Sequence, residues 1–243
     1  PTHTLPASAP AVCLAAHAAG EPQIVKRALE FAETGATVLL TPGFIRAHAD
    51  DTRVLEMAGL AHPGVAPCDL WTFRFAVDGQ AVSGEQHVRF TSQLLPTTAE
   101  TLVTAVHSEG VAPVLTRRAV GAGQVVVISA STFRYPAGSG RVTSAEPVSL
   151  TGLPQLVVDR LRSCLLADAP QVNVRSKVGV YRFGDRLALT NFNDQGATAR
   201  VTGVAGGPRI LYPTGSGDVV PGADGTATVN IPQRGFMVLT VGE

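Results

Sequence analysis

The residues that could most directly carry out chemistry are three cysteines, Cys13, Cys68 and Cys164. A catalytic cysteine needs a lowered thiol pKa, which a helix N-terminus or a neighbouring histidine supplies. Cys13 lies in an apolar strand candidate and Cys164 in an apolar helix candidate, as is typical of small buried hydrophobic residues. Cys68 stands in the run Ala66-Pro67-Cys68-Asp69, and no glycine-flanked turn surrounds it. We therefore predict that the chain has no catalytic residue, and a cysteine hydrolase is the least favoured alternative.

Histidine and aspartate residues form a second group that could carry chemistry. They are His48, Asp50, Asp51 and His62. Such side chains at short spacing can bind a metal ion. They also suit a solvated loop and the start of a helix, where Asp50 or Asp51 would cap the first free N–H groups. We favour the second interpretation and predict no metal site and no cofactor.

Hydroxyl side chains follow two buried strand candidates, residues 36–40 and 124–128, and form a candidate ligand-binding site. These hydroxyls belong to Thr41, Ser129, Ser131 and Thr132. In doubly wound α/β folds, ligands bind at the carboxyl ends of the strands. The hydroxyls could donate hydrogen bonds to a sugar or a phosphate there. The same residues also fit ordinary polar strand ends, so a binding module remains an alternative to a structural role.

The elements that would position these residues begin with a strand–helix–strand unit. The apolar runs Ala11–Ala16 and Ala36–Leu40 flank a helix that opens at Glu21-Pro22, and such units have parallel strands. A strand over Gln124–Ile128 is apolar at nearly every position, which is typical of a strand buried on both faces. We expect both buried strands to lie centrally in a mostly parallel sheet. A turn over residues 120–124 joins the second of them to an earlier strand, as a hairpin.

Other segments of the first part are an antiparallel extension and two helices. Trp71–Val77 alternates between large apolar and other residues, Asp78-Gly79 turns the chain, and Gln86–Phe90 is the expected partner. A helix is expected over about Asp51–Ala58, and residues 100–107 fit a strand only ambiguously. The helix over Leu153–Leu166 has an apolar stripe that we expect to pack on the sheet. The stripe consists of Leu156, Val157, Leu161, Cys164 and Leu165.

Helical periodicity ends near Pro170, and seven short strands with turn signals between them follow. These strands are predicted over residues 172–175, 178–183, 186–191, 197–202, 209–212, 226–231 and 235–241. The predicted fold is therefore an α/β domain over residues 1–169 and an antiparallel β-sandwich over residues 170–243.

Composition limits the partners. The chain has 19 Lys and Arg against 19 Asp and Glu, so its formal net charge is +0. Nucleic acids and acidic membrane surfaces select a basic excess, which argues against both as partners. No apolar run reaches the length of a membrane span. We expect a soluble, cytoplasmic protein, although the chain begins at Pro1 rather than Met, so the lack of a signal peptide does not decide the compartment.

Three segments resemble parts of one enzyme family, in the order expected. The hairpin RRAVGAGQVVVIS resembles the closing strand pair of the trimerisation domain in TIM-barrel β-galactosidases. The segment VYRFGDRLALTNFND resembles the opening of the small C-terminal β domain of those enzymes, and the closing RGFMVLTV resembles the last strand of that domain. The resemblance implies a flavodoxin-like, class I glutamine amidotransferase-like α/β domain that lacks its first strand and helix.

The resemblance also implies a function. No TIM barrel precedes the α/β domain, so the catalytic carboxylates of such enzymes have no counterpart, and the chain would be a non-catalytic assembly region of a larger glycoside-hydrolase-like protein. The elbow cysteine and downstream His-x-Glu of an active amidotransferase are also missing. We expect a homo-oligomer, most simply a trimer, or docking onto a missing N-terminal catalytic domain. Large apolar residues near predicted element ends support this expectation: Phe44, Leu60, Leu70, Trp71, Leu94 and Leu95.

Overall fold

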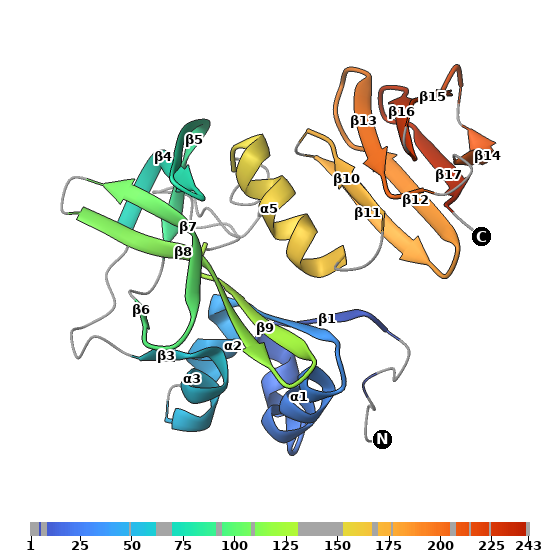
Figure 1. Cartoon of the computed structure of the whole chain (residues 1–243). Coiled ribbons are helices and arrows are strands. Elements are labelled where there is room, and N and C mark those ends of the chain that lie inside the picture. The colour runs from blue at the N-terminus through green and yellow to red at the C-terminus, as the bar shows by residue number, and fades with distance from the viewer. Residues whose placement is uncertain are drawn as a thin grey trace, which may run out of the picture. The chain divides into compact units, whose positions relative to one another are not determined.

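The structure is a computed structural model, shown in Figure 1. It describes residue 5 and residues 9–48, 50–61, 70–90, 94–107, 110–130, 153–166, 170–175, 177–204, 208–213, 215–223 and 225–241. The chain divides into two compact units, residues 1–165 and 166–243, each of which we treat by itself. The division falls close to the boundary expected at Pro170.

A seven-stranded sheet organises the first unit, with the order β1-β2-β9-β8-β7-β4-β5 (Figure 1). Its strands are β1 (Ala11–Leu14), β2 (Thr37–Leu40), β4 (Leu70–Val77), β5 (Gln80–Phe90), β7 (Glu100–His107), β8 (Gly110–Val120) and β9 (Gly123–Ile128). A separate short pair is formed by β3 (Leu60–Ala61) and β6 (Leu95–Pro96).

Strands β2 and β9 lie in the interior of the sheet, as their apolar sequences predicted. β2 pairs in parallel with β1 on one side and β9 on the other, so that Leu40 lies opposite Leu14 and Val127. All four residues of β2 are buried. Val38 and Val125 belong to the core on one face, whereas the residues after them, Leu39 and Val126, belong to the core on the other. Burial on both faces explains why these strands have no polar alternation.

The expectation of a mostly parallel sheet is wrong, because β8, β7, β4 and β5 extend the sheet in antiparallel fashion. The connections explain this arrangement. Only two residues separate β7 from β8, β8 from β9, and β4 from β5. A parallel crossover needs a dozen or more residues, whereas two residues are enough for a hairpin. The ambiguous segment 100–107 is therefore a strand, and the predicted pairing of residues 71–77 with 86–90 is present within a longer hairpin.

Helices cover both faces of the parallel strands. Residues of α1, α2 and α3 share a core with Val38, Leu40 and Val127 on one face. Residues of α5 share a core with Leu39 and Val126 on the other. The helices are η1 (Ala16–Gly20, a 3-10 turn), α1 (Ile24–Glu33), α2 (Pro42–Ala47), α3 (Thr52–Ala58) and α5 (Gln155–Leu166). None of these helices has both the length and the apolar character of a membrane span.

The turn between β8 and β9 needs its glycines for two reasons. Gly121 has a φ of 58°, in the left-handed region that L side chains avoid. A Cβ on Gly121 would also lie 2.7 Å from the Cα of Glu33, at the end of α1. A Cβ on Gly123 would overlap the backbone oxygens of Ala32 and Ala36. The Gly-x-Gly spacing therefore lets the hairpin approach the end of α1 closely.

Helix α5 packs on the sheet as its apolar stripe predicted. Val157 and Cys164 are buried, and Leu156, Leu161 and Leu165 are partly buried against the same core. Because Leu161 keeps some exposure, it is a smaller contributor to the core than the stripe alone indicates.

The second unit contains two four-stranded antiparallel sheets, with the orders β10-β13-β16-β15 and β11-β12-β17-β14 (Figure 1). Inward side chains of both sheets form one core, among them Val201, Val229, Leu187 and Leu239. The strands are β10 (Gln171–Asn173), β11 (Val178–Phe183), β12 (Arg186–Asn191), β13 (Ala197–Thr202), β14 (Arg209–Pro213), β15 (Asp218–Pro221), β16 (Thr226–Ile231) and β17 (Phe236–Thr240).

One strand of this unit was missed in the sequence, since the described residues of the unit form eight strands, β15 among them, where seven were predicted. β15 has only four residues, pairs with β16 alone and is mostly exposed. A short edge strand of this kind lacks the buried alternation by which strands are identified in a sequence.

Candidate functional site

The predicted hydroxyl site lies at the carboxyl ends of β2 and β9. Leu40 is opposite Val127 in the parallel pair, so Thr41 and Ser129 follow neighbouring strand ends. The other two hydroxyl residues, Ser131 and Thr132, lie outside the described residues. The structure therefore brings two of the four predicted residues to one edge of the sheet.

Thr41 uses its hydroxyl to begin a helix. Its Oγ1 accepts a hydrogen bond from the backbone N–H of Phe44 at 3.4 Å, which makes it the N-cap of α2, and Pro42 follows in the first turn. The same hydroxyl donates to the carbonyl oxygen of Leu14 at 3.1 Å. Since the hydroxyl has one hydrogen, this bond leaves Thr41 only acceptor capacity for a ligand.

Ser129 is also engaged by the backbone. The residue is buried, and its hydroxyl donates to the carbonyl oxygen of Pro113 at 2.6 Å. Its backbone N–H donates to the carbonyl oxygen of Val114 at 2.8 Å, so the residue continues the β8–β9 pairing. Both described hydroxyls therefore fit a structural role. The hypothesis of a ligand at the four hydroxyls remains a prediction, which calorimetric titration of the wild type and the Ser131→Ala variant with small sugars would test.

The carboxyl ends of β1 and β2 are further closed by a helix contact. A Cβ on Gly43, in the first turn of α2, would lie 3.1 Å from the Cβ of Ala16 in η1. The backbone N–H of Thr41 donates to the carbonyl of Leu14 at 3.1 Å, which holds the two strand ends together. Little room is left for a ligand above these two strands.

The aspartates of the histidine- and aspartate-rich segment begin helix α3. Asp51 is the N-cap, accepting from the backbone N–H of Arg53 at 3.1 Å, as one of the two predicted alternatives had it. The Arg53 guanidinium donates to both carboxylate oxygens, at 2.8 and 2.7 Å, and holds the pKa of Asp51 below its usual value. His62 lies outside the described residues. Within the described ranges, no three His, Cys, Asp or Glu side chains gather as a metal site would require.

His48 lies between α2 and α3 and packs against a helix residue. The centroid of its ring lies 4.6 Å from that of Phe44, and its Nε2 is buried without a hydrogen-bond partner. A shallow surface depression next to it is lined by Ala47, His48, Asp50, Asp51, Thr52 and Arg53. The depression is open, and the strongest polar groups in it, Asp51 and Arg53, already bind each other.

The described thiols do not have the environment of nucleophiles. Burial raises the pKa of the Cys164 thiol, and desolvation also raises that of Cys13 although the residue is exposed. A raised pKa keeps the thiol protonated at neutral pH, whereas catalysis needs the thiolate. Cys68 lies outside the described residues, so its hypothesis stays open to test.

A polar contact that the sequence did not indicate joins α5 to the sheet. The side-chain amide of Gln124 donates to Thr37 Oγ1 and to the carbonyl oxygen of Cys164, both at 2.9 Å. Thr37 donates to the same carbonyl at 3.2 Å. Thus a free carbonyl near the end of α5 is satisfied by the first residues of β2 and β9. Residues so far apart in the chain leave no local signal of such a contact.

The charged side chains of α5 are partly buried and form ion pairs. The side chains of Asp159 and Arg162 are only 18% and 13% exposed and form an ion pair at 3.4 Å. Arg160 reaches the turn after β4 and binds Asp78 at 3.2 Å. Burial lowers the pKa of Arg162, while the charge of Asp159 opposes that change. Arg160 therefore ties the helix to the turn after β4, whereas Asp159 and Arg162 bind each other within the helix.

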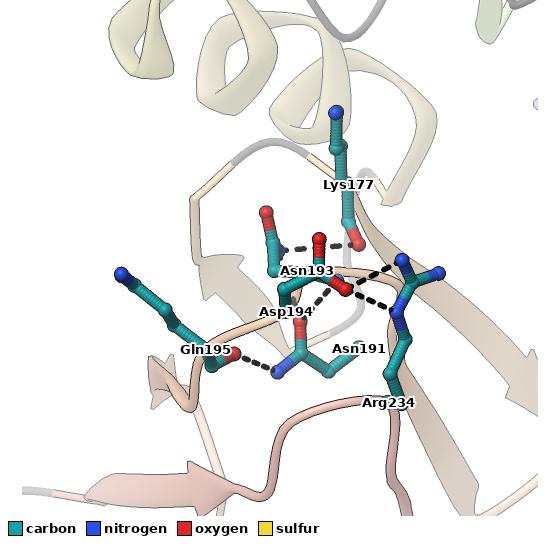
Figure 2. A network of polar contacts seen from close by, with 6 residues as sticks. All are labelled: Lys177, Asn191, Asn193, Asp194, Gln195 and Arg234. Carbon is teal, nitrogen blue, oxygen red and sulfur yellow. Dashed lines mark hydrogen bonds and ion pairs between the residues drawn. The ribbon is translucent and has the colours of Figure 1, made fainter.

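A second polar network closes one end of the sandwich (Figure 2). Asn191 ends β12, is buried, and donates to the carbonyl oxygens of Gln195 and Pro232 at 2.8 and 2.9 Å. Its Oδ1 accepts from the backbone N–H and the side-chain amide of Asn193, at 3.0 and 2.9 Å. The Arg234 guanidinium binds Asp194 beside it, at 2.6 and 2.8 Å. Both polar side-chain atoms of Asn191 form hydrogen bonds within the network. The network therefore holds the turns in place and offers no ligand site.

The apolar residues on which association was predicted are mostly part of the core. Phe44, Leu60, Leu70 and Leu94 are buried within the chain, which is a correction, because the sequence indicated exposed ends of elements. Trp71 and Leu95 are exposed, by 43% and 49%. Of the six residues, therefore, only these two still support an oligomer.

Comparison with known proteins finds similarity only to solved structures. The chain matches no protein family and no curated protein. It is similar to the β-galactosidase of Halorubrum lacusprofundi, with 15% identity over 98% of this chain and 33% of that one, at a TM-score of 0.48. A β-galactosidase of Bacillus circulans sp. alkalophilus gives 17% identity over 95% of this chain and 31% of that one, at a TM-score of 0.39.

A third similarity covers a smaller part of the chain. A cytoplasmic protein of Salmonella typhimurium LT2 gives 12% identity over 50% of this chain and 60% of that one, at a TM-score of 0.36. At identities and TM-scores this low, none of these structures assigns the chain to a family. The chain spans about a third of the length of the two β-galactosidases.

Proposed function

We propose that the chain is a non-catalytic assembly region of a larger glycoside-hydrolase-like protein. The supporting observation is the order of its two units: a mixed-sheet α/β unit with helices on both faces precedes a two-sheet antiparallel sandwich. The three segments that resemble TIM-barrel β-galactosidases lie in these units in the same order. In this proposal, the first unit is a variant of the flavodoxin-like, amidotransferase-like fold.

The chemistry of the described residues is consistent with a non-catalytic role. Cys13 and Cys164 have raised thiol pKa values, and the hydroxyl hydrogens of Thr41 and Ser129 are donated to backbone carbonyls. Glycoside hydrolysis needs a pair of carboxylates on either side of the bond that is cleaved. In this proposal those carboxylates belong to a catalytic domain that precedes Pro1 in the complete protein, and the chain contributes to its assembly.

The sequence of the encoding gene upstream of Pro1 tests this proposal. We expect a TIM barrel with an acidic residue at the carboxyl ends of two of its strands. A gene that encodes no catalytic domain next to this chain would contradict the proposal.

A further inference from the structure

The outer face of the sheet β11-β12-β17-β14 has an unusual share of the exposed aromatic residues. The chain has only nine Phe, three Tyr and one Trp. Tyr181, Phe183, Tyr212 and Phe236 lie on the strands of this sheet and are 46%, 66%, 65% and 44% exposed. Phe192, which is 50% exposed, directly follows β12. Solvent-exposed aromatic residues that gather on one face mark a binding surface.

The register places four side chains in one row on this face. Tyr181 lies opposite Ala188, Ala188 opposite Val238, and Val238 opposite Tyr212. The row faces outward, since Leu187, which precedes Ala188, and Leu239, which follows Val238, are buried in the sandwich core. With roughly 4.8 Å between strands, the backbones at the two tyrosines are about 14 Å apart. The row therefore has a tyrosine at each end and the smaller side chains of Ala188 and Val238 between them.

The ring of Tyr181 lies along its own strand. A Cβ added to Gly179 would lie 2.7 Å from Cε2 and 2.9 Å from the hydroxyl oxygen of Tyr181, so the ring occupies the space that a side chain would take. Covering a strand glycine in this way holds an aromatic ring against the sheet. The remaining ring surface, at 46% exposure, is available to a ligand.

Polar groups next to the row complete the surface. Arg186 and Arg209 both lie opposite Thr240, which places them on the outer face, in the row next to that of the two tyrosines. In the part of the chain that the structure describes, neither guanidinium has a carboxylate partner. Each guanidinium presents several N–H donors in a plane and no acceptor, which suits ligands rich in oxygen atoms.

We propose that this face binds an oligosaccharide of pyranose units. The C–H groups on one face of a pyranose ring are attracted to the negative face of an aromatic ring, and its hydroxyl oxygens can accept from arginine. A protein partner is less favoured, because the middle of the row carries Ala188 and the half-buried Val238 in place of large apolar anchors. The proposal does not depend on the assembly role, which concerns the part of the protein before Pro1.

Calorimetric titration of the whole chain with two tetrasaccharides, of β-1,4-linked galactose and of β-1,4-linked glucose, tests this proposal. We expect saturable binding of at least one of them. Tyr181→Ala and Tyr212→Ala should each weaken it about tenfold, since each removes one stacking ring. Tyr181→Phe keeps the ring and should retain the affinity, and Gly179→Ala should weaken binding by displacing the ring.

Matched controls separate binding from folding. Trp71→Ala removes an exposed aromatic residue of the first unit and should leave the affinity unchanged. Thermal unfolding should give similar midpoints for the wild type and both tyrosine variants, because both rings are exposed. No saturable binding of either tetrasaccharide, or equal binding by the wild type and both alanine variants, would overturn the proposal. Self-association that is lost in Tyr181→Ala, without sugar binding, would show that the face is instead an interface between copies of the chain.

Discussion

A side chain at Gly123 would overlap the carbonyl oxygen of Ala36, so the start of β9 and the residue before β2 fit together only without a Cβ. The backbone N–H of Gln124 donates to that same carbonyl at 3.1 Å. The contact fixes the register of the two central parallel strands, and Gly121 brings the same turn against the end of α1. We expect Gly123 to be one of the positions of the first unit that tolerate substitution least.

Gly123→Ala should destabilise the first unit by about 1–3 kcal/mol, because overpacking against fixed backbone cannot be relieved by a side-chain rotation. Urea unfolding followed by circular dichroism measures the change. Gly20→Ala is the matched control, since no atom lies within 4 Å of a Cβ there. Equal stability of the two variants would mean that the strands are not held as the structure has them.

Asn191→Ala should cost the second unit roughly 1–3 kcal/mol or more, since it leaves buried carbonyl groups without their donor. Asn191→Asp should not restore the stability, because a carboxylate cannot donate to the carbonyls of Gln195 and Pro232. The control is Asn230→Ala, which removes a half-buried side chain hydrogen-bonded to Thr198 and Asp218. A loss for Asn191→Ala no larger than that of the control would show that the network contributes little.

Truncating a core leucine should destabilise the protein more than truncating a leucine of the half-buried stripe of α5. Leu102→Ala on β7, where the leucine is 1% exposed, should destabilise the first unit by about 2–5 kcal/mol. Leu161→Ala should cost less than this range, because Leu161 is only partly buried. The free energy of unfolding of both variants measures the difference. A larger cost for Leu161→Ala would mean that the helix packs more deeply than the structure has it.

The thiol of Cys13 should react slowly at neutral pH. Its pKa is raised above the ordinary 9.0, so less thiolate is present at pH 8 than in a free cysteine peptide, and the alkylation rate should climb only as the pH passes that value. Because the pKa is raised in the folded protein, the thiol's contribution to stability is fully present below pH 9.0, the ordinary pKa. This contribution is lost as the pH rises through the pKa of the thiol in the folded protein. Iodoacetamide labelling of a Cys68→Ser variant, followed by mass spectrometry, isolates Cys13 because Cys164 is buried. Faster labelling than the peptide at pH 8 would contradict the assignment.

Local sequence was sufficient for the parallel strands, α5 and seven strands of the sandwich, because each has a regular apolar pattern. It was also sufficient for the β8–β9 hairpin, because the glycines of its turn are recognisable. It was not sufficient for β7, since residues 100–107 have no clean alternation and a two-residue connection decides the direction of that strand. The bond from Gln124 to the carbonyl of Cys164 joins residues 40 positions apart, and no local pattern reveals it. The row from Tyr181 to Tyr212 likewise exists only once four strands are placed in register.

The exposed apolar surface on which the oligomer prediction rests is smaller than the sequence suggested, since four of the six apolar residues are in the core. We expect the isolated chain to be at most weakly associated, and any association through the first unit to depend on Trp71 and Leu95. Light scattering over a range of concentrations compares the wild type with the Trp71→Ala variant. A stable oligomer that is unaffected by this substitution would place the interface elsewhere.

The proposed function is the assembly of a catalytic protein by a chain that does not itself catalyse the reaction. Its most direct test is the rate of hydrolysis of a p-nitrophenyl β-galactoside by the isolated chain and by the complete polypeptide that the gene encodes. The proposal predicts measurable hydrolysis by the complete polypeptide and none by residues 1–243 alone. Hydrolysis by the isolated chain, or a complete polypeptide with no glycosidase domain and no activity, would contradict it.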